Sequence, residues 1–325
     1  MGKRMRPHTL TLAKPLIPVA GKPMVMRLVE EIIKVSGEKV EEIAFIIGHF
    51  GAEVEQKLLD IAKEFGSKGT IYYQDVPLGT AHAIYCAEKS ISGKVVVAFA
   101  DTLFDAKFKI ETENEASIWV QKVHNPELFG VVKLNENNII TDFIEKPKEF
   151  ITDLAIIGIY YFKDGDNLKS ELKYLLDNNV VVNGEYQLTD ALENMKIKGV
   201  QFRAVQVNEW LDCGNKEATL YTNERMLELK RNEKNTASSA KIINSVVIEP
   251  CFIGENVVIE NSVIGPHLSV SENSVIKNTI IKNSIVQSNT NIENSVIEKS
   301  MIGSHCKVSQ QLNVINIGDY NTIEI

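Results

Sequence analysis

The chain has 325 residues, of which 44% are hydrophobic and 24% charged, and its formal net charge is −8. This length allows one large or two ordinary domains, and the acidic balance argues against a general nucleic-acid-binding protein. No apolar run approaches the ~20 residues of a membrane span, and the N-terminus lacks the apolar segment of a signal peptide. Four scattered cysteines fit neither a disulfide framework nor a metal site, so we expect reduced thiols and a cytoplasmic protein.

The N-terminal segment is basic although the chain is acidic. The first acidic residue, Glu30, comes after these basic residues: Lys3, Arg4, Arg6, Lys14, Lys22 and Arg27. Such a cluster is either a solvated surface segment or a site for a small anion.

Helices and strands alternate from about residue 22 to 233. Apolar residues at helical spacing predict helices at 22–37, 51–66 and 79–90, and short apolar runs predict strands at 43–48, 70–74 and 95–101. This alternation indicates a mostly parallel sheet with helices on both faces. Later strand-like segments add antiparallel pieces, so we predict an α/β domain with a mixed, Rossmann-like sheet. Ligands of such sheets bind beyond the carboxyl ends of the strands.

The hydrophobic period changes after "KNTASSA". Apolar residues then recur every five or six positions, and Asn, Ser and Gly fill the intervals. This period is typical of hexapeptide repeats in a short parallel β-helix, whose coils must stack to bury a core. We therefore predict a first domain at 1–233, a linker at 234–240 and a β-helix domain at 241–325. The repeated positions are Val247, Ile253, Ile259, Ile264, Val270, Ile276, Ile281, Val286, Ile292, Ile297, Ile302 and Val308.

Several polar residues stand at strand ends or turns of the first domain. Gln74 precedes the helix entry "PLGTAHA", where its amide could read a nucleobase or simply face solvent. Asp101 follows the strand "VVVAFA" and could cap the next segment or bind Mg²⁺. Asp212 ends "EWLD" two residues before Gly214, and Glu145 and Lys146 stand side by side in "FIEKP". Adjacent strand residues point to opposite faces, so these last two need not pair.

The order of these motifs, together with "GKRMRP" and "KP" near the start, resembles the sugar-1-phosphate nucleotidylyltransferases. This family includes glucose-1-phosphate thymidylyltransferase and its uridylyl and guanylyl relatives. The resemblance covers residues 2–230, and the tail is similar to the left-handed β-helix of longer members. It implies transfer of a nucleotidyl group from dTTP or UTP to a sugar 1-phosphate, by default glucose 1-phosphate, with Mg²⁺ as cofactor.

The resemblance also implies the following site residues, each taken from a matching motif. Arg4 and Lys14 would contact the nucleotide phosphates, and Lys146 would bind the sugar phosphate, which makes these three the catalytic cations. Gln74 and the Leu78–Gly79 backbone would hold the base. Gly130, in "LFGVV", and Glu145 would bind the sugar, and Asp101 and Asp212 would be the metal ligands.

Family members begin with an apolar strand and a glycine-rich turn, whereas only Met1 precedes Gly2 here. We therefore expect either that Met1 is an internal methionine of a longer chain or that the first strand is really absent. In the second case a regulatory paralogue without turnover becomes an alternative to the enzyme.

A further alternative is a bifunctional enzyme whose β-helix carries an acetyltransferase site. Its candidate residues are His267 and His305, which follow "IGP" and "IGS" at corners of the repeat. The simpler role for the β-helix is oligomerisation, because flat solenoid faces can stack between protomers, and we expect a homo-oligomer.

Overall fold

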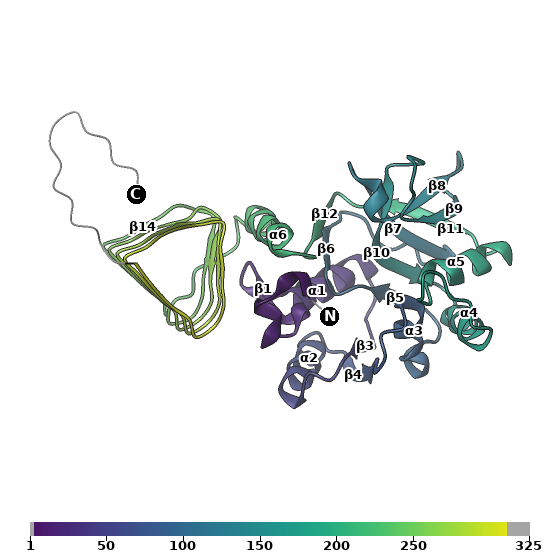
Figure 1. Ribbon diagram of the computed structural model, residues 1–325, viewed down its shortest axis with the longest axis horizontal. Helices are drawn as coiled ribbons and strands as arrows, with labels where there is room; N and C mark the ends of the chain where they lie inside the picture. Colours follow the sequence, from purple (N-terminus) through teal and green to yellow (C-terminus); the bar gives the residue numbers. More distant parts are fainter. Residues whose placement is uncertain (1–2, 311–325) are drawn as a thin grey trace. The chain divides into compact units, whose positions relative to one another are not determined.

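The computed structural model describes residues 3–310 (Figure 1). Met1, Gly2 and the last fifteen positions of the predicted β-helix domain, 311–325, lie outside the described residues. The chain forms two compact units. Unit 1 comprises Lys3, Thr9–Leu16 and Met24–Gly214, and unit 2 comprises Arg4–His8, Ile17–Pro23 and the described part of Asn215–Ile325. The domain boundaries at 233 and 241 stay a prediction.

The largest sheet of unit 1 is mixed, as predicted, but it is mainly antiparallel. The expectation of a mostly parallel sheet is therefore wrong for it, because the later strand-like segments join it in antiparallel pairs. Its strand order is β11-β7-β10-β8-β9, with β5 also beside β10. β11 runs parallel to β7 and the other pairs are antiparallel. The strands are β5 (Val95–Ala98), β7 (Ala116–Lys122), β8 (Gly130–Leu134), β9 (Ile140–Glu145), β10 (Leu154–Phe162) and β11 (Phe202–Gln206).

Two smaller strand pairs complete the β-structure of Met24–Gly214. β3 (Glu42–Ile47) and β4 (Lys68–Tyr73) are parallel, as expected for strands joined through a helix. β6 (Thr102–Asp105) and β12 (Glu209–Asp212) are antiparallel although they are far apart in the chain. The second pair determines where the two predicted metal ligands lie.

The predicted helices are present, and the third is shorter than predicted. The helices of unit 1 are α1 (Met24–Ser36), α2 (Ala52–Glu64), α3 (Thr80–Tyr85), α4 (Gly165–Asp177) and α5 (Leu188–Ile197). Instead of continuing to residue 90, the chain leaves the helical conformation at Ala87 and forms the 3₁₀ helix η4 (Glu88–Ser90). Further 3₁₀ helices are η1 (Lys3–Met5), η2 (His8–Leu10), η3 (Lys14–Leu16) and η5 (Pro126–Leu128).

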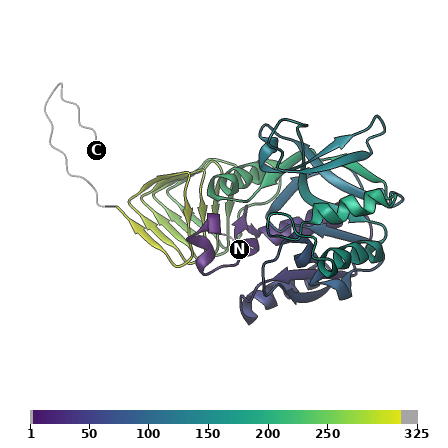
Figure 2. The same cartoon turned by 45° about the vertical axis from the view of Figure 1, so that its right-hand side comes forward.

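Helices α3, α4 and α5 pack together over one face of the mixed sheet (Figure 2). The packed side chains are fully buried, among them Leu168 and Leu172 of α4, Leu192 of α5, and Phe162 and Phe202 of the sheet. α4 begins at a cap, because the carboxylate of Asp164 accepts a hydrogen bond from the Asn167 amide. This core holds the carboxyl ends of several strands in fixed positions.

β10 is interrupted in its middle. Its register with β7 shifts between Ile156 and Tyr160, and Gly158 there has φ +84°. A Cβ at Gly158 would lie 2.9 Å from the Phe99 ring, so only glycine fits without displacing that ring. The strand pairs with β8 before the irregularity and with β5 after it. The interruption leaves room for a cavity beside β10.

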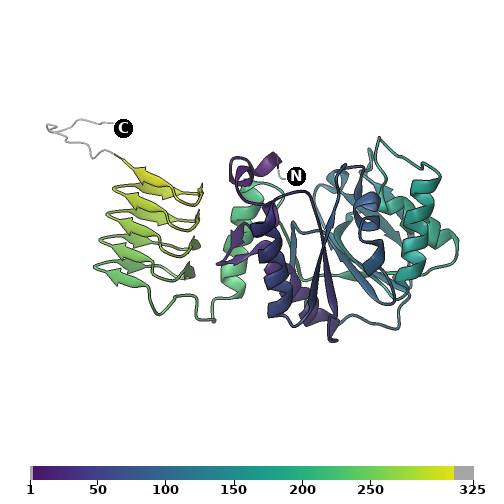
Figure 3. The same ribbon diagram turned by 90° about the horizontal axis from the view of Figure 1, so that it is seen from below.

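Unit 2 contains the parallel β-helix, whose geometry is consistent with the left-handed type (Figure 3). Its described strands form three sheets with five, four and four members. Partners in successive coils are 17 or 16 residues apart, as in Val258↔Val275 and Val275↔Asn291. All twelve repeated apolar positions belong to the core, which confirms the sequence prediction.

The three sheets of the β-helix, called sheets F, G and H, differ in the residues on their outer faces. Sheet F contains β15 (Cys251–Ile253), β18 (Leu268–Val270), β21 (Ile285–Val286) and β24 (Met301–Ile302). Sheet G contains β13 (Lys241–Ile243), β16 (Val258–Glu260), β19 (Val275–Lys277), β22 (Asn291–Glu293) and β25 (Lys307–Ser309). Sheet H contains β14 (Val246–Val247), β17 (Val263–Ile264), β20 (Ile280–Lys282) and β23 (Val296–Glu298).

Asparagine occupies many corners of the β-helix because these positions require positive φ. Asn261 has φ +50° and Asn278 has φ +48°, a region that asparagine tolerates better than most residues. The corner side chains also bond from coil to coil. The Asn244 amide donates to Asn261 at 2.7 Å, and the Asn278 amide donates to Asn294 at 3.1 Å. The polar residues between the repeated apolar positions therefore form the corners and connect successive coils.

Helix α6 (Lys216–Leu229) and the hairpin of β1 (Pro18–Val19) and β2 (Lys22–Pro23) also belong to unit 2. The buried Asn223 of α6 joins them to the β-helix. Its Oδ1 accepts hydrogen bonds from the Ala20 amide at 2.9 Å and from the Ser269 hydroxyl at 2.7 Å. Among residues 3–310, no helix is both long and apolar enough to cross a membrane.

Ile276 tests the stacked core of the β-helix. It is fully buried, so Ile276→Ala should lower the free energy of unfolding of the β-helix by about 3 kcal/mol through lost burial and an unfilled cavity. Urea unfolding followed by circular dichroism measures this change. The control is Val275→Ala, one position away on the outer face, which should cost less than about 1 kcal/mol. Equal losses for both variants would contradict the assignment of faces.

Candidate active site

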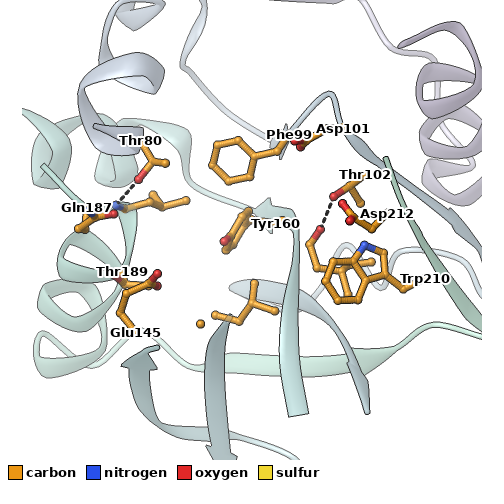
Figure 4. A pocket seen from close by; sticks show the side chains of 15 residues that line it. Thr80, Phe99, Asp101, Thr102, Glu145, Tyr160, Gln187, Thr189, Trp210 and Asp212 are labelled. Atoms are coloured by element: carbon orange, nitrogen blue, oxygen red, sulfur yellow. Dashed lines mark hydrogen bonds between the residues drawn. The ribbon is translucent and has the colours of Figure 1, made fainter. Parts of the chain in front are cut away.

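A cavity of about 240 Å³ lies beside the interruption of β10 (Figure 4). It is lined from several elements of Met24–Gly214: the segment after β5, the paired ends of β8 and β9, the start of α5, and β12. Four predicted site residues line it, and they come from four segments of the chain. They are Asp101, Gly130, Glu145 and Asp212.

Asp101 and Asp212 are brought together by the β6–β12 ladder. Asp212 is opposite Thr102 in the register, and the next amide, of Cys213, donates to the Asp101 carbonyl at 2.9 Å. The Asp212 carboxylate accepts a hydrogen bond from the Gly214 amide at 2.9 Å, which restricts its orientation. Figure 4 shows both side chains at the same end of the cavity. Cys213, the next residue, is fully buried.

Lys14 forms an ion pair with Asp101, with 2.6 Å between Nζ and Oδ2. The Lys14 side chain is 15% exposed and that of Asp101 45% exposed, so the pair is only partly shielded from water. Lys14 lies in η3, which packs against α1. One predicted phosphate-binding cation therefore neutralises one predicted metal ligand.

Gly130 and Glu145 face each other across the β8–β9 pair. A Cβ on Gly130 would lie 2.9 Å from Glu145 Oε2, so the glycine leaves room for the carboxylate at the cavity wall. Lys146 lies just beyond β9, with φ +44° and its ammonium 3.6 Å from Glu145. The two side chains lie close together although neighbours within a strand point to opposite faces, because the strand ends at Glu145 and Lys146 leaves the extended conformation. Lys146 is exposed and is not among the lining residues.

Gln74, Leu78 and Gly79 belong to the loop between β4 and α3. The Gln74 amide donates to the Gly79 carbonyl at 3.1 Å and contacts His82 at 3.0 Å. Gly79 has φ +120°, and a Cβ there would collide with the backbone of Tyr186. Because the Ala81 amide donates to the Tyr186 carbonyl, it is not available to a ligand. Leu78 is 39% exposed, and Thr80, next in the chain, lines the cavity.

The other predicted residues belong to unit 2. Arg4 lies exposed in η1, and its contact with nucleotide phosphates stays a prediction. His267 and His305 occupy corners of the β-helix with positive φ. The His267 ring lies 2.8 Å from Glu228 and 3.1 Å from Asn283, so structural contacts occupy both nitrogens. His305 is exposed.

Several lining residues were not predicted as site residues. Tyr160 and Trp210 line the cavity, and Trp210 also packs edge-on against Phe129 with ring centroids 4.9 Å apart. Burial and then the Glu145 carboxylate raise the pKa of Tyr160, so its phenol remains neutral. Burial and Glu145 also raise the pKa of Asp190 beside the cavity. In the sequence, the continuous aliphatic and aromatic run "AIIGIYYF" does not distinguish Tyr160 from a core residue.

The donor set fits a magnesium ion held jointly with phosphates. In the described part of the chain, no cluster of three or more His, Cys, Asp and Glu side chains forms a metal site. Mg²⁺ commonly takes only one or two carboxylates and completes its shell with water and substrate phosphates. Asp101 and Asp212 provide such a pair. With Glu145 they also make the cavity wall acidic, so phosphates would need cations to enter.

The family model described as "Nucleotidyl transferase" matches residues 1–228 of this chain. A glucose-1-phosphate thymidylyltransferase from Streptomyces antibioticus is 28% identical over 353 aligned positions, covering 100% of this chain and 97% of that protein. The bifunctional protein GlmU from Methanococcus maripaludis is 32% identical over 82% of this chain. The low-salt glycan biosynthesis nucleotidyltransferase Agl11 from Haloferax volcanii is 32% identical over 72% of this chain. The chain spans only 60% of the length of GlmU and 65% of that of Agl11.

A solved structure also resembles this chain. It is a candidate glucose-1-phosphate thymidylyltransferase from Bacillus anthracis, crystallised with sucrose. The TM-score is 0.59 and the sequence identity 26%, over 73% of this chain and 94% of the other.

Lys14 should compete with a divalent cation for Asp101. Without nucleotide, Lys14→Ala should therefore tighten Mn²⁺ binding about fivefold, equivalent to about 1 kcal/mol, because the resident ammonium no longer has to be displaced. Electron paramagnetic resonance of free Mn²⁺ measures the affinity. Lys146→Ala removes an ammonium near Glu145 instead and serves as the control. Unchanged or weaker binding in Lys14→Ala would contradict the competition.

Proposed function

Since this chain belongs to the nucleotidyl transferase family, we propose that it transfers the nucleotidyl group of dTTP or UTP to a sugar 1-phosphate, with glucose 1-phosphate as the sugar substrate. The products are a nucleotide-sugar and pyrophosphate. The thymidylyltransferase from Streptomyces antibioticus, similar along the entire chain, supports this choice of substrates. The single observation that carries the proposal is the cavity lined jointly by Asp101, Gly130, Glu145 and Asp212.

In the proposed reaction, an oxygen of the sugar 1-phosphate attacks the α-phosphorus of the nucleoside triphosphate. A new P–O bond forms, and the bond between the α-phosphorus and the leaving pyrophosphate breaks. The attacking oxygen is already ionised, so it requires no general base. Since both reactants are polyanions, charge neutralisation and in-line alignment dominate the barrier.

The cationic side chains supply this neutralisation. Arg4 and Lys14 stabilise the negative charge on the departing pyrophosphate, and Lys146 positions the sugar phosphate. The Lys14–Asp101 pair fits this role, because the ammonium lies 2.6 Å from the carboxylate of Asp101, which lines the cavity, and can exchange one anion for another. Mg²⁺ bound by Asp101 and Asp212 would supply further charge neutralisation at the phosphates.

The uncharged parts of the substrates are held by other groups of the site. Gln74 and the Leu78–Gly79 backbone bind the base, and the constrained backbone at Gly79 presents that loop in one conformation. The Gly130 backbone and the Glu145 carboxylate bind sugar hydroxyls. Gly130 and Glu145 are paired in the register of β8 and β9, which supports a joint role in binding the sugar. We further propose that the protein works as a homo-oligomer.

Asp101 tests the proposed reaction. Asp101→Asn should lower turnover at least about a hundredfold, which raises the activation free energy by about 2.7 kcal/mol, because the phosphates would lose the divalent cation that the carboxylate would hold. Arg4→Ala should have a similar effect through the leaving group. Pyrophosphate release from dTTP, UTP or GTP with glucose 1-phosphate measures both. Asp105→Asn, at the other end of β6 and outside the cavity lining, is the matched control. Near-normal rates in Asp101→Asn would reject its assignment.

Glu145 tests the sugar subsite. Glu145→Gln should raise KM for the sugar 1-phosphate about tenfold, since a charge-assisted hydrogen bond to a hydroxyl is lost, and should leave KM for the nucleotide unchanged. Initial rates with each substrate varied in turn separate the two constants. Glu149→Gln, at an exposed position four residues later, is the control. If only the KM for the nucleotide changed, the assignment of Glu145 to the sugar subsite would be contradicted.

A further inference from the structure

The outer face of sheet H carries a column of aliphatic side chains, one from each coil. The register aligns Val246 with Val263, Val263 with Ile280, and Ile280 with Val296. Val246, Ile280 and Val296 are 56%, 51% and 71% exposed. Their inward neighbours Val247, Ile264, Ile281 and Ile297 fill the core, so burial in the chain does not account for the apolar character of the column. We call these four outward residues the aliphatic column.

The other two sheets differ from sheet H. On sheet F the outward Phe252 contacts Gly21 of the β1–β2 hairpin, and Ile285 is only 1% exposed, so this face is already covered within unit 2. On sheet G the outward positions at the strand ends carry charges in three coils, at Glu260, Lys277 and Glu293. Sheet H is therefore the apolar outer face of the described β-helix that no other element of unit 2 covers.

The apolar surface extends beyond the column at the first coil. Ile243 and Ile248 flank Val246 and are 48% and 44% exposed. Together these residues expose on the order of 500 Å² of aliphatic surface, a patch size that is commonly functional on a monomer. The area of this patch together with a surrounding polar rim approaches the roughly 800 Å² that each partner buries in a stable protein interface.

Charged side chains line the two sides of the aliphatic column. On the sheet G side, Lys277 forms an ion pair with Glu260 of the previous coil at 3.1 Å. On the other side, Lys282 forms an ion pair with Glu298 of the next coil at 3.5 Å. An apolar centre between charged, solvent-accessible sides is the usual arrangement of a protein interface.

We propose that the aliphatic column is the contact surface between two copies of this chain, packed face to face with their β-helix axes antiparallel. The proposal specifies the surface of the homo-oligomer proposed above, and it does not depend on the reaction. A two-fold axis across the middle of the column places Val263 against the partner's Ile280, and Val246 against the partner's Val296. The surface is thereby self-complementary, as an isologous dimer requires.

The charges select the antiparallel arrangement over the parallel one. In the antiparallel pair, Lys277 faces the partner's Glu260 on one side of the column, and Glu260 faces the partner's Lys277. In a parallel pair, Lys277 would face the partner's Lys282, and Glu293 would face the partner's Glu298. Such like-charge contacts are unfavourable.

Sedimentation velocity of the full chain tests the proposal. We expect a dimer at micromolar concentration, and Ile280→Glu should raise its Kd at least a hundredfold by placing carboxylates in the apolar centre. Val275→Glu is the matched control, because it puts the same side chain on the outer face of sheet G in the same coil and should leave Kd unchanged. Circular dichroism of both variants verifies that the β-helix is folded.

A charge reversal tests the orientation. Lys277→Glu should raise the dimer Kd about tenfold, and combining it with Glu260→Lys should restore the original value, because opposite charges again meet across the interface. A monomeric wild-type chain, or an Ile280→Glu variant that dimerises normally, would overturn the proposed surface. A lower Kd for Lys277→Glu would overturn the antiparallel arrangement, since the new carboxylate would then face a lysine. The readout is mass, so it is independent of nucleotidyl transfer.

Discussion

The β6–β12 ladder is the contact on which the candidate site depends. It joins two segments that lie more than a hundred residues apart and brings Asp101 and Asp212 to one end of a cavity. Neither carboxylate alone would attract a divalent ion strongly, whereas the two together with substrate phosphates would provide the coordination that Mg²⁺ favours. In the free protein, the ion pair between Lys14 and Asp101 reduces the electrostatic repulsion between these carboxylates.

The two units illustrate different ways of building a core. In Met24–Gly214 the helices and the mixed sheet bury side chains through contacts between distant segments, and a glycine with positive φ in β10 interrupts the regular strand where the cavity forms. In the β-helix each coil contacts mainly the coil above and the coil below, and the same inward positions repeat. The first arrangement can place dissimilar groups around a ligand, whereas the second produces long uniform surfaces.

Much of this organisation could be predicted from the sequence, because periodicity reports local structure. The twelve inward residues of the β-helix and helices α1 and α2 follow directly from apolar spacing. The pairing of β6 with β12 could not be predicted in this way, because register between distant strands depends on tertiary packing. Tyr160 and Trp210 were missed as cavity residues for a related reason: an aromatic residue of the core and one of a cavity wall share the same local pattern. The proximity of Glu145 and Lys146 depends on a backbone angle that their identities do not reveal.

The corner asparagines of the β-helix have a consequence for how such chains can change length. Each coil carries its own positive-φ corners and its own hydroxyl and amide bonds to the neighbouring coil, as between Asn244 and Asn261 and between Asn278 and Asn294. Insertion or removal of one entire repeat therefore exchanges one set of equivalent contacts for another, whereas a shift of a few residues would misalign every later corner. Related solenoids are thus free to diverge in length in steps of one coil.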